Sequence, residues 1–413
     1  MRRPRRGCAV GVSTLGAAPA AAFLSDVWCE GRRSLMDLTQ GINAVMLCFL
    51  AVGGADYLLG GRFGLGKEFE EGIVTCGRLL LVMAGFMVLA PLIARGLGPV
   101  VSPLFHAMGV DPSILAGMML ANDSGGLPLA LELADTQEAG LFSVLIVGSM
   151  LGTTVMLGIP TIMMFATQAE RPSVIYGLLC GLVTIPLGCL AGGLAAGFRT
   201  ELVVRNSAPV LVLSVVLLVL LLLLKERIVP VFSAFGKMMT AVSIFGLVCG
   251  AAESLLGITV FPGMGTLEEV FPVVGSIAVF LGGAFTLVAV VRRVFAAALG
   301  RAGRLLRIND SSVSALILSL ANSLAAILMI HEMDDRGRLL NIAFLTSAGC
   351  ALGDHLAYTN QIAPELCAPV MVGKLVGGIS ALAAALLLAK RLPLSAGTGQ
   401  QAERGSAADE LMI

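Results

Sequence analysis

Long apolar runs separated by short polar stretches dominate the pattern along this chain. Nine of the runs approach the ~20 residues that an α-helix needs to cross a bilayer. They lie near residues 41–59, 73–95, 139–166, 173–197, 207–224, 236–258, 270–291, 338–356 and 368–389. Two more apolar segments, 112–134 and 312–333, are interrupted by small polar residues. The pattern predicts an all-α polytopic membrane protein with about eleven hydrophobic elements, two of them broken or re-entrant helices.

The two interrupted segments are copies of one pattern. PSILAGMMLANDSGGLPLALELAD at 112–135 aligns with SVSALILSLANSLAAILMIHEMDD at 312–335, at a constant offset of 200. Gly-x-Gly and Glu-Glu pairs that precede the runs at 73–95 and 270–291 repeat at nearly the same offset. Paired interruptions in corresponding places of two halves indicate the binding site of a transporter. We therefore expect two five-element repeats.

These repeats divide the chain. We expect a first transmembrane repeat over 36–206, a linker helix within 207–235 and a second repeat over 236–390. Residues 1–35 form an arginine-containing, Ala-rich extension, which is typical of a targeting segment. The same extension also fits a start placed ahead of a working start at Met36. The charged segment 391–413 is expected to be a disordered tail.

The distribution of basic residues predicts how the repeats are oriented. The loop 292–307 carries five arginines and should be cytoplasmic, whereas loops 257–269 and 357–367 carry no Lys or Arg and should be outside. Extending this assignment makes the second repeat inverted relative to the first. Arg199 and Arg205 argue against the inversion, because they lie in a loop that it places outside.

Composition supports the membrane assignment and excludes other classes. The 413 residues are 57% hydrophobic and 13% charged, whereas a soluble domain carries about 25% charged residues. The formal net charge is zero, so nothing indicates a nucleic-acid partner. The nine cysteines form no C-x-x-C pair, and we expect no metal, no cofactor and no catalytic residue.

The first interruption holds the strongest candidate chemistry. Asn122, Asp123, Ser124 and Gly125 lie together in it. Unwound backbone at bilayer depth is tolerated only in a cavity or buried in protein, and Asp123 adds a negative charge suited to a small ammonium ligand. The alternative is a packing kink in which Asp123 caps the second half-helix. The second interruption retains Asn322 and Ser323, which complete the predicted substrate site.

Four residues are candidates for proton or ion coupling. Asp354 and His355 are adjacent, and a carboxylate can tune an imidazole across neutral pH. Lys374 lies in the last apolar run and could pair with a buried carboxylate, and Glu132 follows the first interruption. The alternatives are an interfacial cap for Asp354 and His355 and a return to the membrane interface for Glu132.

The chain resembles the ethanolamine-utilisation permease family (EutH) over about 36–390. The resemblance is carried by GRFGLGKEFEEG at 61–72, LANDSGGLPLALELA at 120–134, EAGLFS at 138–143, PLGCLAGGLAAGF at 186–198, MDDRGR at 333–338, GDHLAY at 353–358 and VGKLVGG at 372–378. It implies a multi-pass protein of the bacterial inner membrane that moves ethanolamine into the cell for a cobalamin-dependent lyase. The second interruption, ANSLAAI, departs from the more polar stretch expected in the family.

The expected function is therefore transport of ethanolammonium, with ethanolamine and the lipid bilayer as partners and a homo-oligomer left open. An ion-coupled carrier of another small amine or an organic acid is the main alternative. An intramembrane aspartyl protease is a remote one, because such enzymes pair two intramembrane Asp residues. A membrane sensor without flux is the fourth reading.

Overall fold

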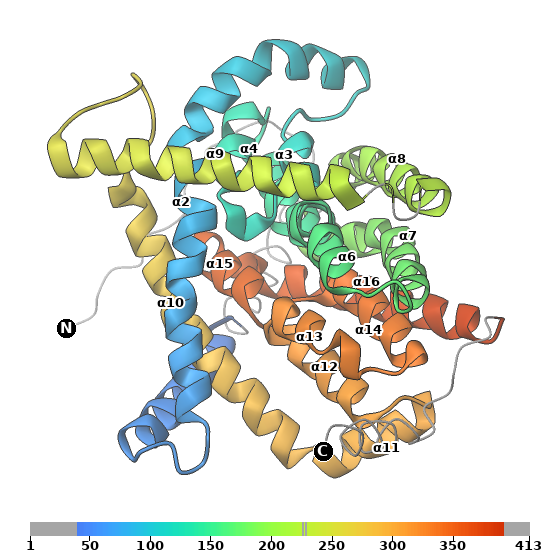
Figure 1. The fold of residues 1–413 in the computed structure, drawn as a ribbon. Helices are drawn as coiled ribbons and strands as arrows, with labels where there is room; N and C mark the ends of the chain where they lie inside the picture. Colours follow the sequence, from blue (N-terminus) through green and yellow to red (C-terminus); the bar gives the residue numbers. More distant parts are fainter. Residues whose placement is uncertain (1–38, 225–226, 228, 392–413) are drawn as a thin grey trace, which may run out of the picture.

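The computed structural model describes residues 39–224, 227 and 229–391, and every regular element in this part of the chain is helical (Figure 1). Eight helices are long and apolar enough to cross a membrane. They are Thr39–Leu58, α2 with its bounds at Gly66–Ala107, Gln137–Phe165, α7 at Arg171–Ala195, α8 at Thr200–Leu224, Pro230–Leu256, α10 at Leu267–Val294 and Pro364–Ala389. The expected extension 1–35 and nearly all of the expected tail 391–413 lie outside the described residues.

One of the nine predicted spans is wrong. The run at 338–356 forms two shorter helices, α14 at Asp335–Ala348 and α15 at Asp354–Ile362, separated by a turn. An apolar run alone does not reveal this turn, since most of its residues are small and apolar. The remaining eight runs each correspond to a long helix, and α2 extends well beyond the predicted 73–95.

The long helices pack in close pairs. The helix α2 packs against α10 and against α9 (Val229–Leu256), which lies across it in Figure 1. The helix α7 packs against α8, α14 and α16 (Cys367–Ala389). A methyl group added at Gly188 of α7 would lie 2.7 Å from the Gly373 carbonyl oxygen of α16. Small residues therefore set this approach, as they do in membrane helix bundles.

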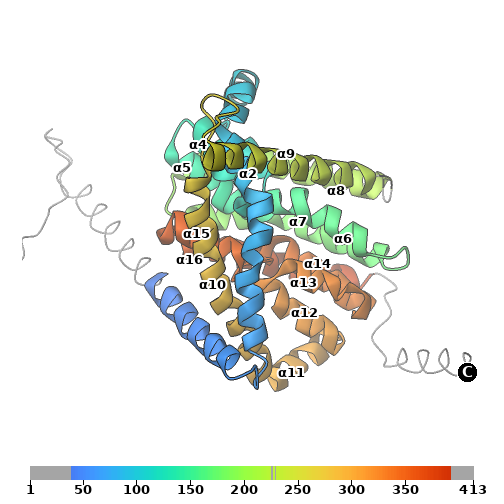
Figure 2. The ribbon, with the colours of Figure 1, turned by 60° about the vertical axis from the view of Figure 1, so that its left-hand side comes forward.

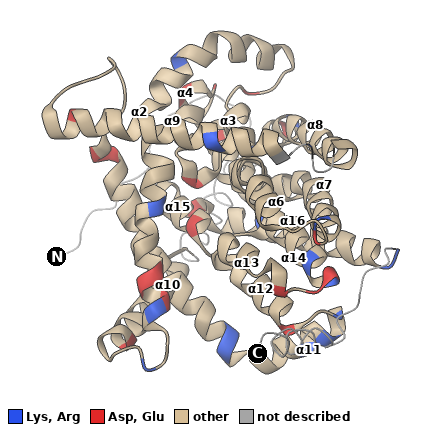
Figure 3. Cartoon of the chain, in the orientation of Figure 1, with Lys and Arg blue, Asp and Glu red and all other residues tan. Residues whose placement is uncertain are grey.

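The outward surface of several long helices is apolar. Leu223 on α8 is 75% exposed, and Val231 and Phe245 on α9 are more than half exposed. Figure 3 shows most of the length of each long helix without charged positions. Contiguous exposed apolar surface of this extent suits lipid rather than water, so the chain is a multi-pass membrane protein.

The other helical elements are short. They are α3 at Ile114–Met119, α4 at Gly126–Leu133, α5 at Gln137–Leu141, α6 at Ile159–Phe165, α11 at Ala296–Leu306, α12 at Asp310–Ala321 and α13 at Ser323–Leu328, with 3₁₀ turns at Asn122–Ser124, Ile330–Glu332 and Pro364–Leu366. The helices α5 and α6 form the two ends of the helix Gln137–Phe165, and α11 lies at the lower edge of the molecule in Figure 2. Between α5 and α6 the chain is π-helical over Phe142–Gly152 and Thr154–Gly158. π-Helical turns widen a helix and are frequent at functional sites.

Two acidic residues hold loops in place. Asp56 is 3% exposed, and its carboxylate accepts hydrogen bonds from the backbone N–H groups of Phe63, Leu65 and Gly66. Glu170, in the loop before α7, accepts from the Thr167 backbone N–H and pairs with Arg338 at 3.6 Å. Burial raises the pKa of Glu170, but these contacts and a hydrogen bond with His331 outweigh it, so the pKa lies below its ordinary value.

Candidate functional site

The first interruption is a true break in the helix, as predicted. The helix α3 ends at Met119, Leu120 and Ala121 are extended, and a 3₁₀ turn at Asn122–Ser124 leads into α4. Gly125 has a φ of 76°, and a side chain there would meet the Met83 carbonyl oxygen. A residue with a Cβ would be strained at this position, which explains the glycine.

The second interruption is milder than the first. Asn322 alone is extended between α12 and α13, and its side-chain oxygen accepts from the Ala325 backbone N–H. This is an N-cap, which begins the second half-helix without any further unwound residue.

A third break, which the sequence did not predict, lies between α14 and α15. Cys350 has a φ of 55°, which is rare for a residue other than glycine. Its backbone N–H donates to the Ser319 carbonyl, and the Leu352 N–H donates to the Leu320 carbonyl. The turn is therefore fastened to the end of α12, beside the second break. Gly349, Gly353 and the polar pair that follows were the available sequence signals.

The three breaks meet around one cavity of about 190 Å³. The predicted residues Asp123, Asn322, Ser323, Asp354 and His355 line it. Its other polar lining residues are Ser149, Thr153, Thr154, Thr161, Thr346 and Cys350. Ligand pockets for drug-sized molecules span about 300–1,000 Å³, so this cavity suits a smaller molecule.

The other predicted substrate residues lie behind the cavity wall. Asn122, Ser124 and Gly125 are buried but do not line the cavity. The Asn122 amide nitrogen donates to the His355 carbonyl at 3.3 Å, which ties the first break to α15. The Asn122 side-chain oxygen is buried with no hydrogen-bond partner among the residues that the structure describes. Buried polar atoms are nearly always paired, so this oxygen is available to a ligand or to a rearranged neighbour.

Lys374 does not line the cavity but lies behind Ser149 and His355 of its lining as a fixed cation. It is 1% exposed, and its Nζ donates to the Ser149 carbonyl at 2.6 Å and to His355 Nδ1 at 2.9 Å. The other ring nitrogen, Nε2, lies 3.3 Å from Thr153 Oγ1, which itself donates to the Gly148 carbonyl. A proton on Nε2 and a free lone pair on Nδ1 satisfy every one of these contacts. The geometry therefore assigns a neutral imidazole beside a charged ammonium.

Two carboxyl groups face this ammonium. Asp123 is 6% exposed, and its carboxyl interacts with the carboxyl of Asp354, which lines the same cavity. Both carboxyls also interact with the charge of Lys374. With all three groups ionised, the site carries one net negative charge. Asp123 is thus part of the cavity surface, and among the described residues its side chain receives one long hydrogen bond, 3.5 Å, from the Ser124 hydroxyl.

Ser149, in the first π-helical stretch, and Thr153, between the two stretches, line the cavity, and sequence reasoning missed both. A methyl group added at Gly152 would overlap the carbonyl oxygen of Leu120, so the unwound part of the first break rests directly on this segment. A run rich in small residues, GSMLGTT at 148–154, was the available signal. Glu132, in contrast, is exposed and does not line the cavity.

Three residues beside the cavity could also be considered as a metal site. Ligand atoms of Cys350, Asp354 and His355 lie within 4.8 Å of one another. Both ring nitrogens of His355 are already hydrogen-bonded, however, and the Lys374 ammonium at 2.9 Å would repel a metal cation. We assign no metal ligands, and the expectation of a metal-free protein stays a prediction.

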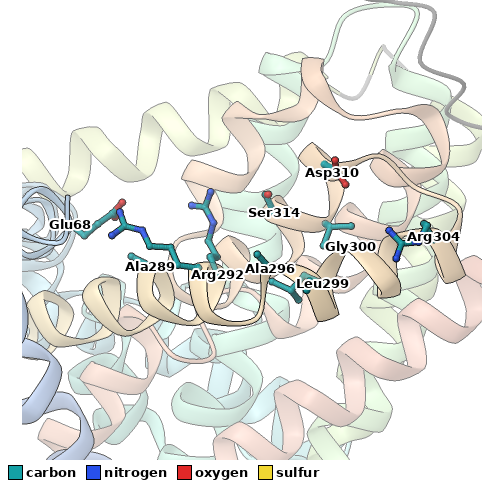
Figure 4. Close-up of a pocket in the computed structure, with 12 residues that line it drawn as sticks. Glu68, Ala289, Arg292, Ala296, Leu299, Gly300, Arg304, Asp310 and Ser314 are labelled. Carbon is teal, nitrogen blue, oxygen red and sulfur yellow. The ribbon is translucent and has the colours of Figure 1, made fainter. Parts of the chain in front are cut away.

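A larger cavity of about 790 Å³ lies at the junction of α10, α11 and α12 (Figure 4). Its lining includes Arg292, Arg293 and Arg304 against Glu68 and Asp310. The net positive charge of these five residues disfavours an organic cation. The smaller cavity at the three breaks is therefore the candidate site for an ammonium ligand.

The comparisons with known proteins point the same way. The family model described as "Ethanolamine utilisation protein, EutH" matches residues 38–388. A relative from Listeria monocytogenes serotype 1/2a (strain 10403S), named "Probable ethanolamine permease EutH", is 40% identical over 86% of this chain and 96% of its own length. A relative of the same name from Salmonella typhimurium is 34% identical, with the same coverage of both chains.

A third relative, "Uncharacterized protein YxeR" from Bacillus subtilis (strain 168), is 37% identical over 85% of this chain and 95% of its own length. No solved structure matches the chain. The family model and these relatives cover nearly the same residues as the eight long helices and the three breaks. The chain therefore belongs to the EutH family of ethanolamine-utilisation membrane proteins.

Proposed function

We propose that this protein carries ethanolammonium across the bacterial plasma membrane into the cell. The observation that carries the proposal is the cavity at the three breaks, which two carboxyls line while the single fixed ammonium of Lys374 lies buried behind the lining. A small cation bound there would bring the formal charge of the site to zero. The names of the relatives, which are probable ethanolamine permeases, support the substrate.

Each end of ethanolammonium has suitable partners. The ammonium group would donate to the carboxylates of Asp123 and Asp354, and charge-assisted hydrogen bonds of this kind are the strong ones. The hydroxyl would meet the polar groups of the second break and the π-helical segment, Asn322, Ser323 and Thr153. An organic acid, the main alternative substrate, would instead be repelled by the two carboxyls.

The pair of carboxyls also gives one observation in favour of an aspartyl protease. Two close carboxyls can share a proton, as such enzymes require. Against this, the cavity of about 190 Å³ has no room for an extended peptide, and Lys374 supplies a charge that competes for the pair. Cleavage of a membrane peptide by purified protein would favour the protease. Uptake without cleavage would favour the carrier.

Uptake into proteoliposomes tests the proposal. Purified protein is reconstituted, and the initial rate of labelled ethanolamine uptake at pH 6 is compared with that of protein-free liposomes. We expect protein-dependent uptake that excess unlabelled ethanolamine inhibits and acetate does not. Asp354→Asn should lose this uptake, whereas Glu332→Gln, an acid-to-amide change at an exposed position, should keep it. Uptake that acetate blocks and ethanolamine does not would overturn the proposal.

We propose in addition that the two halves are inverted repeats. The pairing of α2 with α10 and of α7 with α16 supports the proposal, because each pair consists of helices in corresponding positions of the two halves. Cysteines introduced at the exposed positions Gln137 and Glu332 should react with an impermeant reagent from opposite sides of the membrane. Reaction from the same side would contradict the inversion.

A further inference from the structure

The formal charges of the residues around the cavity indicate a second activity of the protein. Asp123 and Asp354, which line the cavity, supply two negative charges, and Lys374, which is hydrogen-bonded to Ser149 and His355 of the lining, supplies one positive charge. Other titratable groups that face these three are His355 on α15, Cys350 in the third break, Cys189 on α7 and Tyr358 on α15. Thiol and phenol groups are ordinarily neutral near pH 7, and the hydrogen bonds of His355 assign it as neutral. The ionised site therefore lacks one positive charge.

Lys374 cannot supply that charge by moving. Its ammonium is held by the Ser149 carbonyl of the π-helical segment and by the imidazole of α15, and the side chain is 1% exposed. A buried charge is costly unless it is paired. A site with an uncompensated carboxylate is therefore disfavoured whenever the cavity is closed to water on both sides.

Only two simple species can balance the site. One is a monovalent cation, such as ethanolammonium, and the other is a proton shared by the two adjacent carboxyls. They exclude each other, since both together would leave the closed site with an unpaired positive charge. The site can therefore switch from facing one side of the membrane to facing the other in two states only, with a cation bound or with a proton bound.

Resting on the proposed function, we propose that this protein is an exchanger that releases one proton to the outside for each ethanolammonium that it brings in. Facing outside, the carboxyl pair gives its proton to water and binds the ammonium group. Facing inside, ethanolammonium leaves and one proton from the cytoplasm binds to the pair. One positive charge moves in each direction, so the cycle transfers no net charge.

The exchange has a quantitative consequence. An electroneutral cycle is driven by the gradients of ethanolammonium and protons and is indifferent to the membrane potential. A uniport of ethanolammonium would instead respond to the potential. About 60 mV, negative inside, would drive a singly charged uniport to about tenfold accumulation.

Wild-type proteoliposomes provide the test. A potential of about 60 mV is imposed with a potassium gradient and valinomycin at equal pH on both sides, and labelled ethanolamine uptake is followed. Exchange predicts no accumulation above the external concentration. Accumulation of about tenfold would overturn exchange while leaving the carrier function intact. Absence of any protein-dependent uptake would overturn both proposals.

A second readout follows the proton directly. Liposomes loaded with a pH-sensitive dye should alkalinise inside when ethanolamine is added outside, at a rate above that of protein-free liposomes, which report the leak of the neutral amine. Uptake without protein-dependent alkalinisation would overturn the exchange.

Two variants distinguish a specific role of the carboxyl pair from a general loss of folding or activity. Asp354→Asn leaves Asp123 and Lys374 balanced without a ligand, so both uptake and alkalinisation should fall to the protein-free rate. Glu332→Gln should keep both activities at the wild-type rate. A thermal unfolding midpoint within a few degrees of wild type shows that each variant is folded. A folded Asp354→Asn protein that still couples uptake to alkalinisation would overturn the proposal.

Discussion

Replacing Asp123 with asparagine removes one carboxylate from the cavity while keeping the size of the side chain. Asp123 is proposed to accept a hydrogen bond from the ammonium group of the substrate. A hydrogen bond to a charged group contributes about 1.5–3 kcal/mol. Its loss should therefore weaken ethanolamine binding about 10- to 150-fold.

The same change should act in the opposite direction on stability. The Asp123 carboxyl is 6% exposed, receives only one long hydrogen bond and lies beside the carboxyl of Asp354. A neutral amide removes the repulsion between the two carboxyls and is cheaper to bury than a charge. The thermal unfolding midpoint of Asp123→Asn should equal or exceed that of wild type.

Measuring both quantities on one preparation tests the reasoning. Binding of labelled ethanolamine is measured by scintillation proximity at pH 6, and unfolding is followed by a thermal shift without ligand. Glu332→Gln serves as the matched control and should keep both values. Wild-type affinity in Asp123→Asn would remove Asp123 from the site. Weak binding together with a lowered midpoint would refute the charge argument, because the loss would then follow from misfolding.

The remaining predictions concern positions that hold the site in place. Gly152→Ala should lower stability by about 1–3 kcal/mol and reduce uptake, because the added methyl overlaps a carbonyl of the first break. The control Gly77→Ala lies on an open helix surface and should be neutral or slightly stabilising in the same thermal shift assay. Glu170→Gln should destabilise by about 1–3 kcal/mol by leaving Arg338 with one acidic partner fewer. The pKa of Glu170 is lowered in the folded state, so the stabilisation that its carboxylate provides is complete above the ordinary pKa of 4.5 and is lost as the pH falls through the folded-state pKa. A difference in unfolding free energy between wild type and variant that grows on acidification would contradict this. Asp56→Asn should lower the thermal unfolding midpoint, because an amide oxygen cannot replace both acceptor atoms that bind three backbone N–H groups. An unchanged midpoint would show that the loop does not depend on these hydrogen bonds.

The apolar runs and the two breaks were predictable because their causes are local. A helix needs a stretch of residues long enough to cross the bilayer, and small polar residues with Gly125 interrupt it wherever they stand. The resemblance between 112–135 and 312–335 then indicated which breaks matter. Each of these signals lies within a single segment, so local sequence patterns were enough to find them.

Other features depend on contacts between residues far apart in the sequence and could not be predicted from local patterns. The third break lies in a run with few polar residues, and its turn is fastened by hydrogen bonds to carbonyls about thirty residues earlier in α12. The exposure of Glu132 likewise follows from which face of α4 packs inward. Hydrophobic periodicity says that a face is buried but does not say against which helix.

The chain by itself therefore determined the membrane class, eight of the long helices and the two interrupted helices, since each depends on composition or on residues close together in sequence. Tertiary structure alone decided that Asp123 meets Asp354 and that Lys374 meets His355 and Ser149. Electrostatic pairing depends on distance in space, and these partners come together only when separate helices pack around one cavity.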